Sequence, residues 1–246
     1  MKTVLVTGGA KGIGKGIALK FAKEGYSVCI NYFRSETQAK ETLAEISKIS
    51  KGFAVKGDVS KEPDVEKIVA FAVEKMGKID VLVNDAGFVG RKPGTQIVEL
   101  SEEEWDEVMG INVKGVFLMT KHVAKHMIEK KIKGRIVNIS SVSGLTPSTL
   151  AGAHYATSKH GVIGFTRNSA RELAKHGILV NSVAPGFVKT DMVKVFGEEK
   201  LKDFEAKTPT GSFSTPEDIA EAVFFLANAR NTNGQTLVVD GGMLMH

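Results

Sequence analysis

The chain has 246 residues, of which 42% are hydrophobic, and a mean hydropathy of −0.04, so it can bury a core and is not predicted to be disordered. Its 33 basic and 28 acidic residues are interleaved, and no recognition helix, zinc-ligand spacing or stacking-aromatic motif accompanies the net charge of +5, which argues against nucleic-acid binding. The single cysteine, Cys29, and the lack of a signal-peptide core or a long apolar run predict a cytoplasmic protein that is not inserted in a membrane.

Short β-branched runs alternate with amphipathic helical patterns along the chain. Strands are expected at Thr3–Thr7, Ser27–Tyr32, Gly52–Gly57, Asp80–Val83, Arg135–Ile139, Ile178–Val183 and Thr236–Val239. Helices are expected at Ile13–Glu24, Glu36–Ser47, Asp64–Met76, Glu102–Ile128, His154–Ala174 and Pro216–Ala227. Because strand, helix and strand alternate throughout, the sequence predicts an α/β, doubly wound Rossmann fold with a seven-stranded parallel sheet and helices on both faces.

No linker rich in Pro, Gly or Ser divides the chain, so residues 1–246 are predicted to form a single domain for dinucleotide binding and catalysis. Ser101 and Glu104 have the spacing of a capping box, and Thr215-Pro216 places a proline in the first turn of the last helix. Residues 185–214 show no regular pattern, and we expect them to form a mobile loop at the substrate site.

The first expected strand is followed by a glycine-rich turn that opens a helix. In this turn Gly8 permits a tight bend, Gly12 lets the backbone approach a pyrophosphate, and Gly14 lets the helix pack closely on the sheet. No Gly-Lys-Ser/Thr follows, which excludes a Walker loop. Amides at a helix N-terminus bind phosphate. The predicted phosphate-binding residues are Gly8, Gly9, Gly12, Ile13 and Gly14.

The end of the second strand indicates which dinucleotide is bound. Enzymes that use NAD place an acid there to bind the ribose 2′-hydroxyl, but here the first acid is Glu36, beyond Arg34. Arg34 can form a fork on a 2′-phosphate, and Lys11 in the glycine turn can add a second positive charge. The sequence therefore favours NADP(H).

Tyr155 and Lys159 are four residues apart in an expected helix, so their side chains lie on one face. A cation about 5 Å from a phenol, at an effective dielectric constant of roughly 20, favours the phenolate by about 3 kcal/mol. The pair therefore predicts a tyrosine with a lowered pKa, ready for proton transfer. The histidines do not predict a metal site, because His122 and His126 share a helix face but no third ligand is apparent.

Together these motifs resemble the short-chain dehydrogenase/reductase family, and the resemblance covers essentially the whole chain. It rests on Thr7-Gly-x-x-x-Gly12-x-Gly14, Asp58-Val59, Asn84-Asp-Ala-Gly87, Asn112, Ser141, Tyr155-x-x-x-Lys159 and Pro185-Gly186. The implied catalytic residues are Asn112, Ser141, Tyr155 and Lys159.

The resemblance also implies a role for each of these residues. Ser141 is expected to bind the substrate carbonyl oxygen, and Tyr155 to donate a proton to it. Lys159 is expected to hold the nicotinamide ribose and to lower the pKa of Tyr155, and Asn112 to hold a water that resupplies the proton. The remaining implied cofactor-binding residues are Asp58 and Val59 at the adenine, Asn84, Ala86 and Gly87 at the ribose, and Pro185, Gly186, Val188 and Thr190 near the carboxamide.

Within the family, residues 180–192 and 240–243 resemble the branch that reduces 3-oxoacyl thioesters on acyl carrier protein with NADPH, in fatty acid biosynthesis. The chain departs from the family pattern at Asp85, which replaces an asparagine, and by one extra residue between Ser141 and Tyr155. It also carries Ile132 between Lys131 and Lys133 where the family has a basic docking residue for the carrier protein.

Two other functions stay open from the sequence. The same chemistry could act on a small ketone, a sugar or a polyol, because the loops at the substrate mouth are not readable from sequence. A catalytically silent NADP(H)-binding sensor would require loss of a catalytic residue, and none is lost. The resemblance also implies a homotetramer.

Overall fold

Seven parallel strands form the centre of the protein in the computed structural model, which describes residues 1–92, 94–147, 151–191, 193 and 197–245. The strands are β1 (Thr3–Thr7), β2 (Ser27–Tyr32), β3 (Gly52–Lys56), β4 (Val81–Asn84), β5 (Arg135–Ile139), β6 (Leu179–Pro185) and β7 (Thr236–Val239). Their order in the sheet is β3-β2-β1-β4-β5-β6-β7. The predicted fold class and all seven predicted strands are confirmed; four strands have the predicted bounds, and the bounds of β3, β4 and β6 differ by one or two residues.

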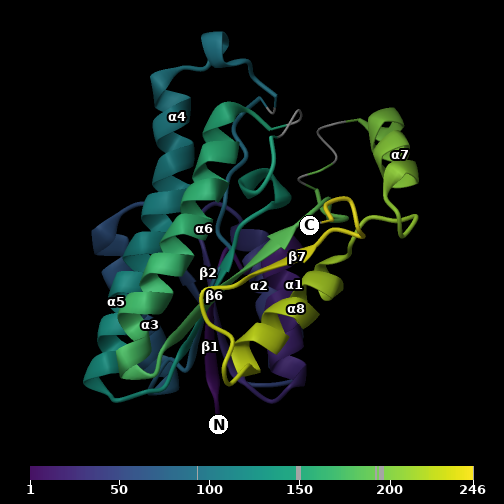
Figure 1. Ribbon diagram of the computed structural model, residues 1–246. Coiled ribbons are helices and arrows are strands. Elements are labelled where there is room, and N and C mark those ends of the chain that lie inside the picture. The colour runs from purple at the N-terminus through teal and green to yellow at the C-terminus, as the bar shows by residue number, and fades with distance from the viewer. Residues whose placement is uncertain (93, 148–150, 192, 194–196, 246) are drawn as a thin grey trace.

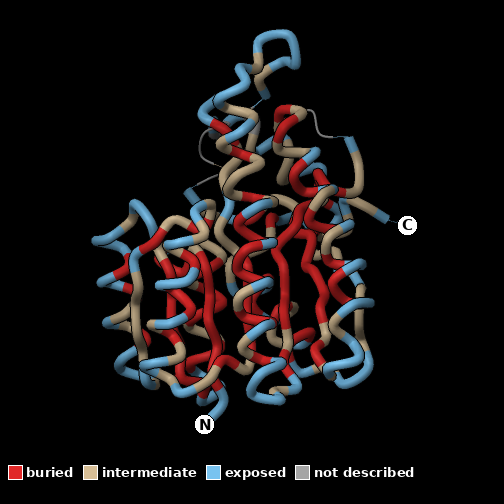
Figure 2. Tube along the Cα trace, turned by 90° about the vertical axis from the view of Figure 1, so that its left-hand side faces the viewer, coloured by how far each residue is buried: buried red, intermediate tan, exposed pale blue. Residues whose placement is uncertain are grey.

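Helices cover both faces of this sheet, as Figure 1 shows. They are α1 (Gly12–Lys23), α2 (Glu36–Ser47), α3 (Glu62–Met76), α4 (Glu102–Met109), α5 (Gly115–Glu129), α6 (Ala153–Leu173), α7 (Glu198–Lys207) and α8 (Pro216–Asn228). One core packs α1, α2 and α8 on the sheet through residues such as Phe21, Ile46 and Val223, and the other packs α3, α5 and α6. Figure 2 shows the buried strands between the half-exposed helices.

The predicted helix Glu102–Ile128 is wrong as a single element. The structure breaks it into α4 and α5, with a π-helical turn at Gly110–Lys114 between them. A π turn inserts one residue into a helix, and such turns are frequent at functional sites. Here the inserted turn contains Asn112, whose side chain bonds to the backbone of Phe88 in the loop after β4.

The prediction that residues 185–214 are irregular is also wrong in part, because α7 lies within them. This helix is mostly charged, so it lacks the apolar periodicity by which helices are recognised in a sequence. The ring of Phe204 on α7 stacks on Phe187 at 5.4 Å between ring centroids, and Phe213 lies 5.0 Å from Phe187. The aromatic contacts tie α7 to the end of β6.

The expected helix caps are found with one difference. The hydroxyl of Ser101 accepts from the amide of Glu104, but the carboxylate of Glu104 does not complete a capping box and instead accepts from the amide of Arg91. A full capping box occurs at Thr215 and Asp218, where α8 begins. No helix in the described part of the chain is both long and apolar enough to cross a membrane.

Candidate active site

A cleft of about 930 Å³ opens at the carboxyl ends of the strands, beside the neighbouring strands β1 and β4. After β1 the chain adds strands toward one edge of the sheet, and after β4 it adds them toward the other edge. In a doubly wound sheet, this reversal of strand order is where a dinucleotide binds. Most of the predicted cofactor-binding residues line the cleft: Gly8, Lys11, Gly12, Ile13, Arg34, Asp58, Val59, Ala86, Gly87, Tyr155, Lys159, Pro185, Gly186, Val188 and Thr190. Ser141 lines it as well.

The glycine turn between β1 and α1 is shaped by close backbone contacts. Gly8 and Gly12 have φ of 67° and 57°, a conformation that favours glycine. A Cβ on Gly8 would lie 2.9 Å from Cα of Ala86, and one on Gly14 would lie 2.5 Å from the carbonyl oxygen of Gly8. Gly9 packs on Ile30. Neither Gly9 nor Gly14 lines the cleft, so their part is to let the turn close rather than to border the cofactor.

The far end of the cleft, beside β2 and β3, is held by local hydrogen bonds. The side-chain amide of Asn31 donates to the carbonyl oxygen of Gly57, and Asp58 accepts from both the amide and the hydroxyl of Ser60. Thr42 on α2 donates to the carbonyl oxygen of Ala10. These bonds fix the backbone on either side of Asp58, which suits a preformed adenine pocket.

Arg34 and Lys11 both face this end of the cleft, as the sequence predicts. Arg34 is 76% exposed, and its Nη2 lies 3.5 Å from Oε1 of Glu107 on α4. Its guanidinium also lies over the ring of Phe33, 5.4 Å from the centroid. Glu107 lines the same cleft and was not singled out by sequence reasoning, because a carboxylate in a helix rich in glutamate carries no signal of its own.

The serine and tyrosine that the sequence predicts to be catalytic meet at the end of β5. Tyr155, in the first turn of α6, forms a hydrogen bond with the side chain of Ser141. The Ser141 hydroxyl also accepts from the amide of Ser143 at 3.1 Å, which fixes its position. A carbonyl oxygen placed between the two hydroxyls could receive a hydrogen bond from each of them.

Lys159 lies one turn further along α6 and is buried. Its Nζ donates to the carbonyl oxygen of Ile139 at 2.8 Å and lies 5.6 Å from the centroid of the Tyr155 ring. Burial lowers the pKa of Lys159 to about 8, although the charge of Asp85 acts in the opposite direction. The ammonium therefore lies beside the tyrosine in the cleft, as the four-residue spacing predicts.

The predicted fall in the pKa of Tyr155 is not found. Burial raises the pKa of Tyr155 to about 12, the hydrogen bond with Ser141 lowers it only in part, and the carboxylate of Asp85 raises it further. Lys159 does not offset this rise, because with a pKa of about 8 its ammonium loses its charge well below the pH at which Tyr155 ionises. A tyrosine with this pKa is protonated at neutral pH, which is the form that donates a proton.

Asp85, the departure from the family pattern, lies between the glycine turn and Lys159. Its amide and that of Ala86 both donate to the hydroxyl of Thr7, so the backbone contact of this motif is kept. Burial raises the pKa of its carboxyl to about 7, while the charge of Lys159 and the amide of Gly14 act to lower it. This carboxyl therefore changes its charge near neutral pH inside the cleft.

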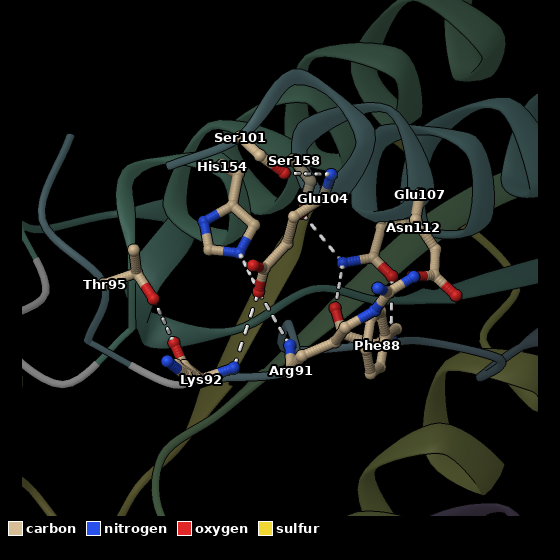
Figure 3. Close-up of polar contacts among 10 residues, drawn as sticks. All are labelled: Phe88, Arg91, Lys92, Thr95, Ser101, Glu104, Glu107, Asn112, His154 and Ser158. Carbon is tan, nitrogen blue, oxygen red and sulfur yellow. Dashed lines mark hydrogen bonds and ion pairs between the residues drawn. The ribbon is translucent and has the colours of Figure 1, made fainter. Parts of the chain in front are cut away.

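Asn112 lies outside the cleft lining and holds two elements together (Figure 3). Its Oδ1 accepts from the amide of Phe88 at 2.8 Å, and its Nδ2 donates to the carbonyl oxygen of Phe88 and to the hydroxyl of Ser158, each at 2.9 Å. Both hydrogens of the side-chain amide are therefore used within the protein. Ser158 was missed in the sequence, although it lies in the segment between Tyr155 and Lys159.

Glu104 anchors the loop after β4 beside this point. Its Oε1 accepts from the amide of Arg91 at 2.7 Å and lies 3.7 Å from Nε2 of His154, whose side chain is fully buried at the start of α6 (Figure 3). Burial lowers the pKa of His154, and Glu104 acts to raise it. The residue before the catalytic tyrosine is thus packed against a carboxylate of α4.

Asn84, expected near the ribose, is instead buried in the sheet. Its Nδ2 donates to Oδ1 of Asn138 at 2.8 Å and to the hydroxyl of Thr120 at 3.2 Å. Because it does not line the cleft, the structure gives it a part in holding β4 to β5 and α5. Of the three residues expected at the ribose, Ala86 and Gly87 line the cleft and Asn84 does not.

The expectation that His122 has no further candidate ligand is wrong. The structure brings Glu62 and Glu66 of α3 beside it, with potential ligand atoms within 4.8 Å of one another, while His126 is not part of the group. Oε1 of Glu62 already contacts Nζ of Lys121 at 2.7 Å and Nε2 of His122 at 3.0 Å. Because these contacts satisfy the carboxylate, we assign no metal to this group.

Comparisons with known proteins agree with this arrangement. Residues 8–244 match the family described as enoyl-(acyl carrier protein) reductase. A 3-oxoacyl-[acyl-carrier-protein] reductase of Synechocystis sp. is 40% identical over 248 residues, which cover 99% of this chain and 97% of the relative.

Two solved structures share the fold over nearly their whole length. A variant of actinorhodin polyketide ketoreductase with NADPH has a TM-score of 0.91 at 38% identity, covering 98% of this chain and 97% of that one. A 3-ketoacyl-(acyl-carrier-protein) reductase from Brucella melitensis with NADH has a TM-score of 0.90 at 36% identity, with the same coverage.

Proposed function

Because the chain belongs to the short-chain dehydrogenase/reductase family, whose members are nicotinamide-dependent oxidoreductases, we propose that it reduces a 3-oxoacyl thioester on acyl carrier protein to the 3-hydroxyacyl thioester with NADPH. The observation that carries the proposal is the hydrogen-bonded pair of Ser141 and Tyr155 in the dinucleotide cleft, with Lys159 one turn away. The names of the relatives support the thioester substrate.

Ser141, Tyr155 and Lys159 each have a separate role in the proposed reaction. The cofactor, when bound, supplies the hydride to the substrate carbonyl carbon. Ser141 and Tyr155 donate hydrogen bonds to the carbonyl oxygen, and Tyr155 transfers its proton as that oxygen gains negative charge. Lys159 holds the ribose hydroxyls, with its position fixed by Ile139.

Asn112 is proposed to act through its backbone rather than its side chain. The side-chain amide is engaged with Phe88 and Ser158. A π turn leaves helical carbonyl groups without their usual partners, and such a carbonyl could hold the water that resupplies the proton to Tyr155.

The experiment that tests the substrate is a panel assay at a fixed concentration of NADPH. Acetoacetyl thioester on acyl carrier protein should be reduced with a higher kcat/KM than simple ketones, sugars or polyols. A preference for a ketone or a sugar would favour the alternative reading, in which the same site serves another carbonyl. Residues 148–150, in the interval between Ser141 and Tyr155 that is one residue longer than the family pattern, lie outside the described residues.

The cofactor preference is proposed to rest on Lys11 and Arg34. NADPH should be preferred over NADH by at least about tenfold in kcat/KM, which is roughly 1.4 kcal/mol. Arg34→Asp should abolish or reverse this preference, because the fork on the 2′-phosphate is replaced by a like charge. Steady-state kinetics with both cofactors measures it, and equal use of the two by the native protein would contradict the assignment.

A basic surface offers a docking site for the carrier protein. One basic segment consists of three exposed lysines, Lys130, Lys131 and Lys133. A second basic segment, Lys175 and His176, directly precedes Gly177. A Cβ on Gly177 would lie 3.1 Å from Cγ of Lys133, so the two basic segments lie side by side. An acidic carrier would be attracted to such a patch, with a dependence on salt.

We also propose a homotetramer that forms in the cytoplasm. The resemblance implies that the contacts between subunits lie on three apolar segments, Val113–Met119, Val162–Phe165 and Ala222–Leu226. Two rings in them are exposed, Phe117 to 44% and Phe225 to 61%, and Phe117 packs edge-on against Phe165. Burial of such rings between subunits is favourable. Small-angle scattering at micromolar concentration should give the mass of four chains, and the mass of one chain would exclude this assembly.

A further inference from the structure

We propose that Glu107 is a specificity-determining residue that competes with the 2′-phosphate of NADPH for Arg34 and so limits the preference for NADPH over NADH. This inference rests on the proposed function, because it takes Arg34 as the residue that binds the 2′-phosphate. It concerns a carboxylate on α4, far in the sequence from the glycine turn and from β2.

Glu107 lies between two arginines and contacts both. Its Oε1 lies 3.5 Å from Nη2 of Arg34, and its Oε2 accepts from Nε and Nη2 of Arg91 at 3.2 and 2.9 Å (Figure 3 shows the contact with Arg91). The side chain of Glu107 is only 19% exposed, whereas those of Arg34 and Arg91 are 76% and 68% exposed. The carboxylate is therefore the fixed partner and Arg34 the one that can leave.

The contact spans the cofactor cleft. Arg34 follows β2 and Glu107 belongs to α4, and both line the same cavity, together with Asp58 and Val59 of the expected adenine pocket. An arginine that binds a 2′-phosphate must direct its guanidinium to that phosphate. It must then give up or share its contact with Glu107, so the free energy of that contact is subtracted from the binding of NADPH.

NADH carries a hydroxyl in place of the 2′-phosphate, so its binding does not require Arg34 to give up the contact with Glu107. A carboxylate near the adenosine ribose is also the group that NAD enzymes use for that hydroxyl. The chain has no acid at the end of β2, where such a carboxylate ordinarily lies. Glu107 brings one to the same end of the cleft from the opposite wall.

Arg91 limits the repulsion between Glu107 and a phosphate. Two nitrogens of Arg91 donate to Oε2 of Glu107, and this ion pair offsets the charge of the carboxylate. Arg34, Glu107 and Arg91 together therefore carry a single positive charge. If Arg91 is removed, Arg34 is the one arginine of the three-residue cluster that still offsets the charge of Glu107. The binding of NADPH should then weaken more than that of NADH.

The test is the dissociation constant of each cofactor, measured by cofactor fluorescence on the full chain. Glu107→Gln keeps the shape of the side chain and should tighten NADPH by about two- to fivefold, the range of a single exposed ion pair, with NADH unchanged or weakened. Asp106→Asn is the matched control: it removes one negative charge from the neighbouring position of the same cleft and should give a smaller change. Arg91→Ala should shift the preference in the opposite direction.

The role of Arg34 is tested separately by combining the variants. In an Arg34→Ala background, Glu107→Gln should change the ratio of the two dissociation constants by less than it does in the native protein, because only the direct effect of the carboxylate on each cofactor is left. If Arg34→Ala alone leaves that ratio unchanged, the proposed use of NADP(H) through Arg34 fails. If Arg34→Ala changes the ratio but Glu107→Gln does not, or if Asp106→Asn has an equal effect, the competition by Glu107 is overturned. Thermal unfolding of each variant confirms that it is folded.

Discussion

Replacement of Tyr155 by phenylalanine should lower kcat by about 10²- to 10⁴-fold, the range of a general acid, while the affinity for NADPH stays nearly unchanged. The ring keeps its place at the start of α6, so only the hydroxyl that bonds with Ser141 is lost. Stopped-flow or steady-state kinetics gives kcat, and fluorescence titration gives the dissociation constant of NADPH. If the variant kept more than a tenth of the native activity, the proton would come from another group.

A matched control for this variant is Tyr32→Phe, which removes a phenol elsewhere in the same cleft lining. It should leave kcat within a small factor of the native value, because Tyr32 lies at the end of β2 and far in the fold from Ser141. A comparable loss in both variants would show that the cleft, and not the proton donor, had been damaged.

Much of the fold could be predicted because its signals are local. The apolar runs of β1, β2, β4 and β5 are buried in the centre of the sheet, and the glycine turn shows where the first crossover begins. By contrast, α7 is charged on nearly all sides and gives no periodic signal. Its position depends on contacts of Phe204 with rings that are distant in the sequence.

The site was predicted as a set of residues but not as a set of interactions. The i,i+4 spacing correctly brings Tyr155 and Lys159 to one cleft, yet the direction of the ammonium depends on Ile139, a backbone partner on another element. The pKa of Tyr155 could not be obtained from the spacing either. Burial, which is a property of the whole fold, raises the pKa of Tyr155 and lowers that of Lys159, so the cation loses its charge well below the pH at which Tyr155 ionises.

Asn112 shows how local structure and function are joined here. The helix pattern at residues 102–128 is continuous in the sequence, and only the side-chain bonds of Asn112 to Phe88 and Ser158 reveal why a π turn is inserted. These bonds connect the loop after β4 with the catalytic helix α6. A residue expected to hold a water thus also fixes the distance between two walls of the site.

Replacement of Lys159 by alanine should reduce both the affinity for NADPH and kcat. The loss of a charged hydrogen-bond partner corresponds to about 1.5–3 kcal/mol, so the dissociation constant of NADPH should rise by roughly 10- to 100-fold. The turnover number should fall as well, since the ammonium that we propose to hold the ribose lies 5.6 Å from the centroid of the Tyr155 ring. Circular dichroism should show an unchanged fold, because the hydrogen bond to Ile139 is a single contact at the carboxyl end of β5.

The pH dependence of cofactor binding distinguishes the contribution of the positive charge of Lys159 from that of the size of its side chain. Because burial lowers its pKa to about 8, the side chain is charged below that pH and neutral above it. The affinity of the native protein for NADPH should therefore weaken as the pH rises through about 8, and Lys159→Ala should lose this dependence.

Asp85 is the group most able to obscure this result, since its carboxyl gains a negative charge as the pH rises through about 7 in the same cleft. Asp85→Asn should remove the part of the pH dependence near pH 7 and shift the part that belongs to Lys159 to lower pH, because the carboxylate of Asp85 raises the pKa of Lys159. Because the charge of Lys159 lowers the pKa of Asp85, the decisive variant is Lys159→Ala in the Asp85→Asn background. If this double variant retained a transition near pH 8, a different group would be titrating, and the ammonium of Lys159 could not be the charge that holds the cofactor.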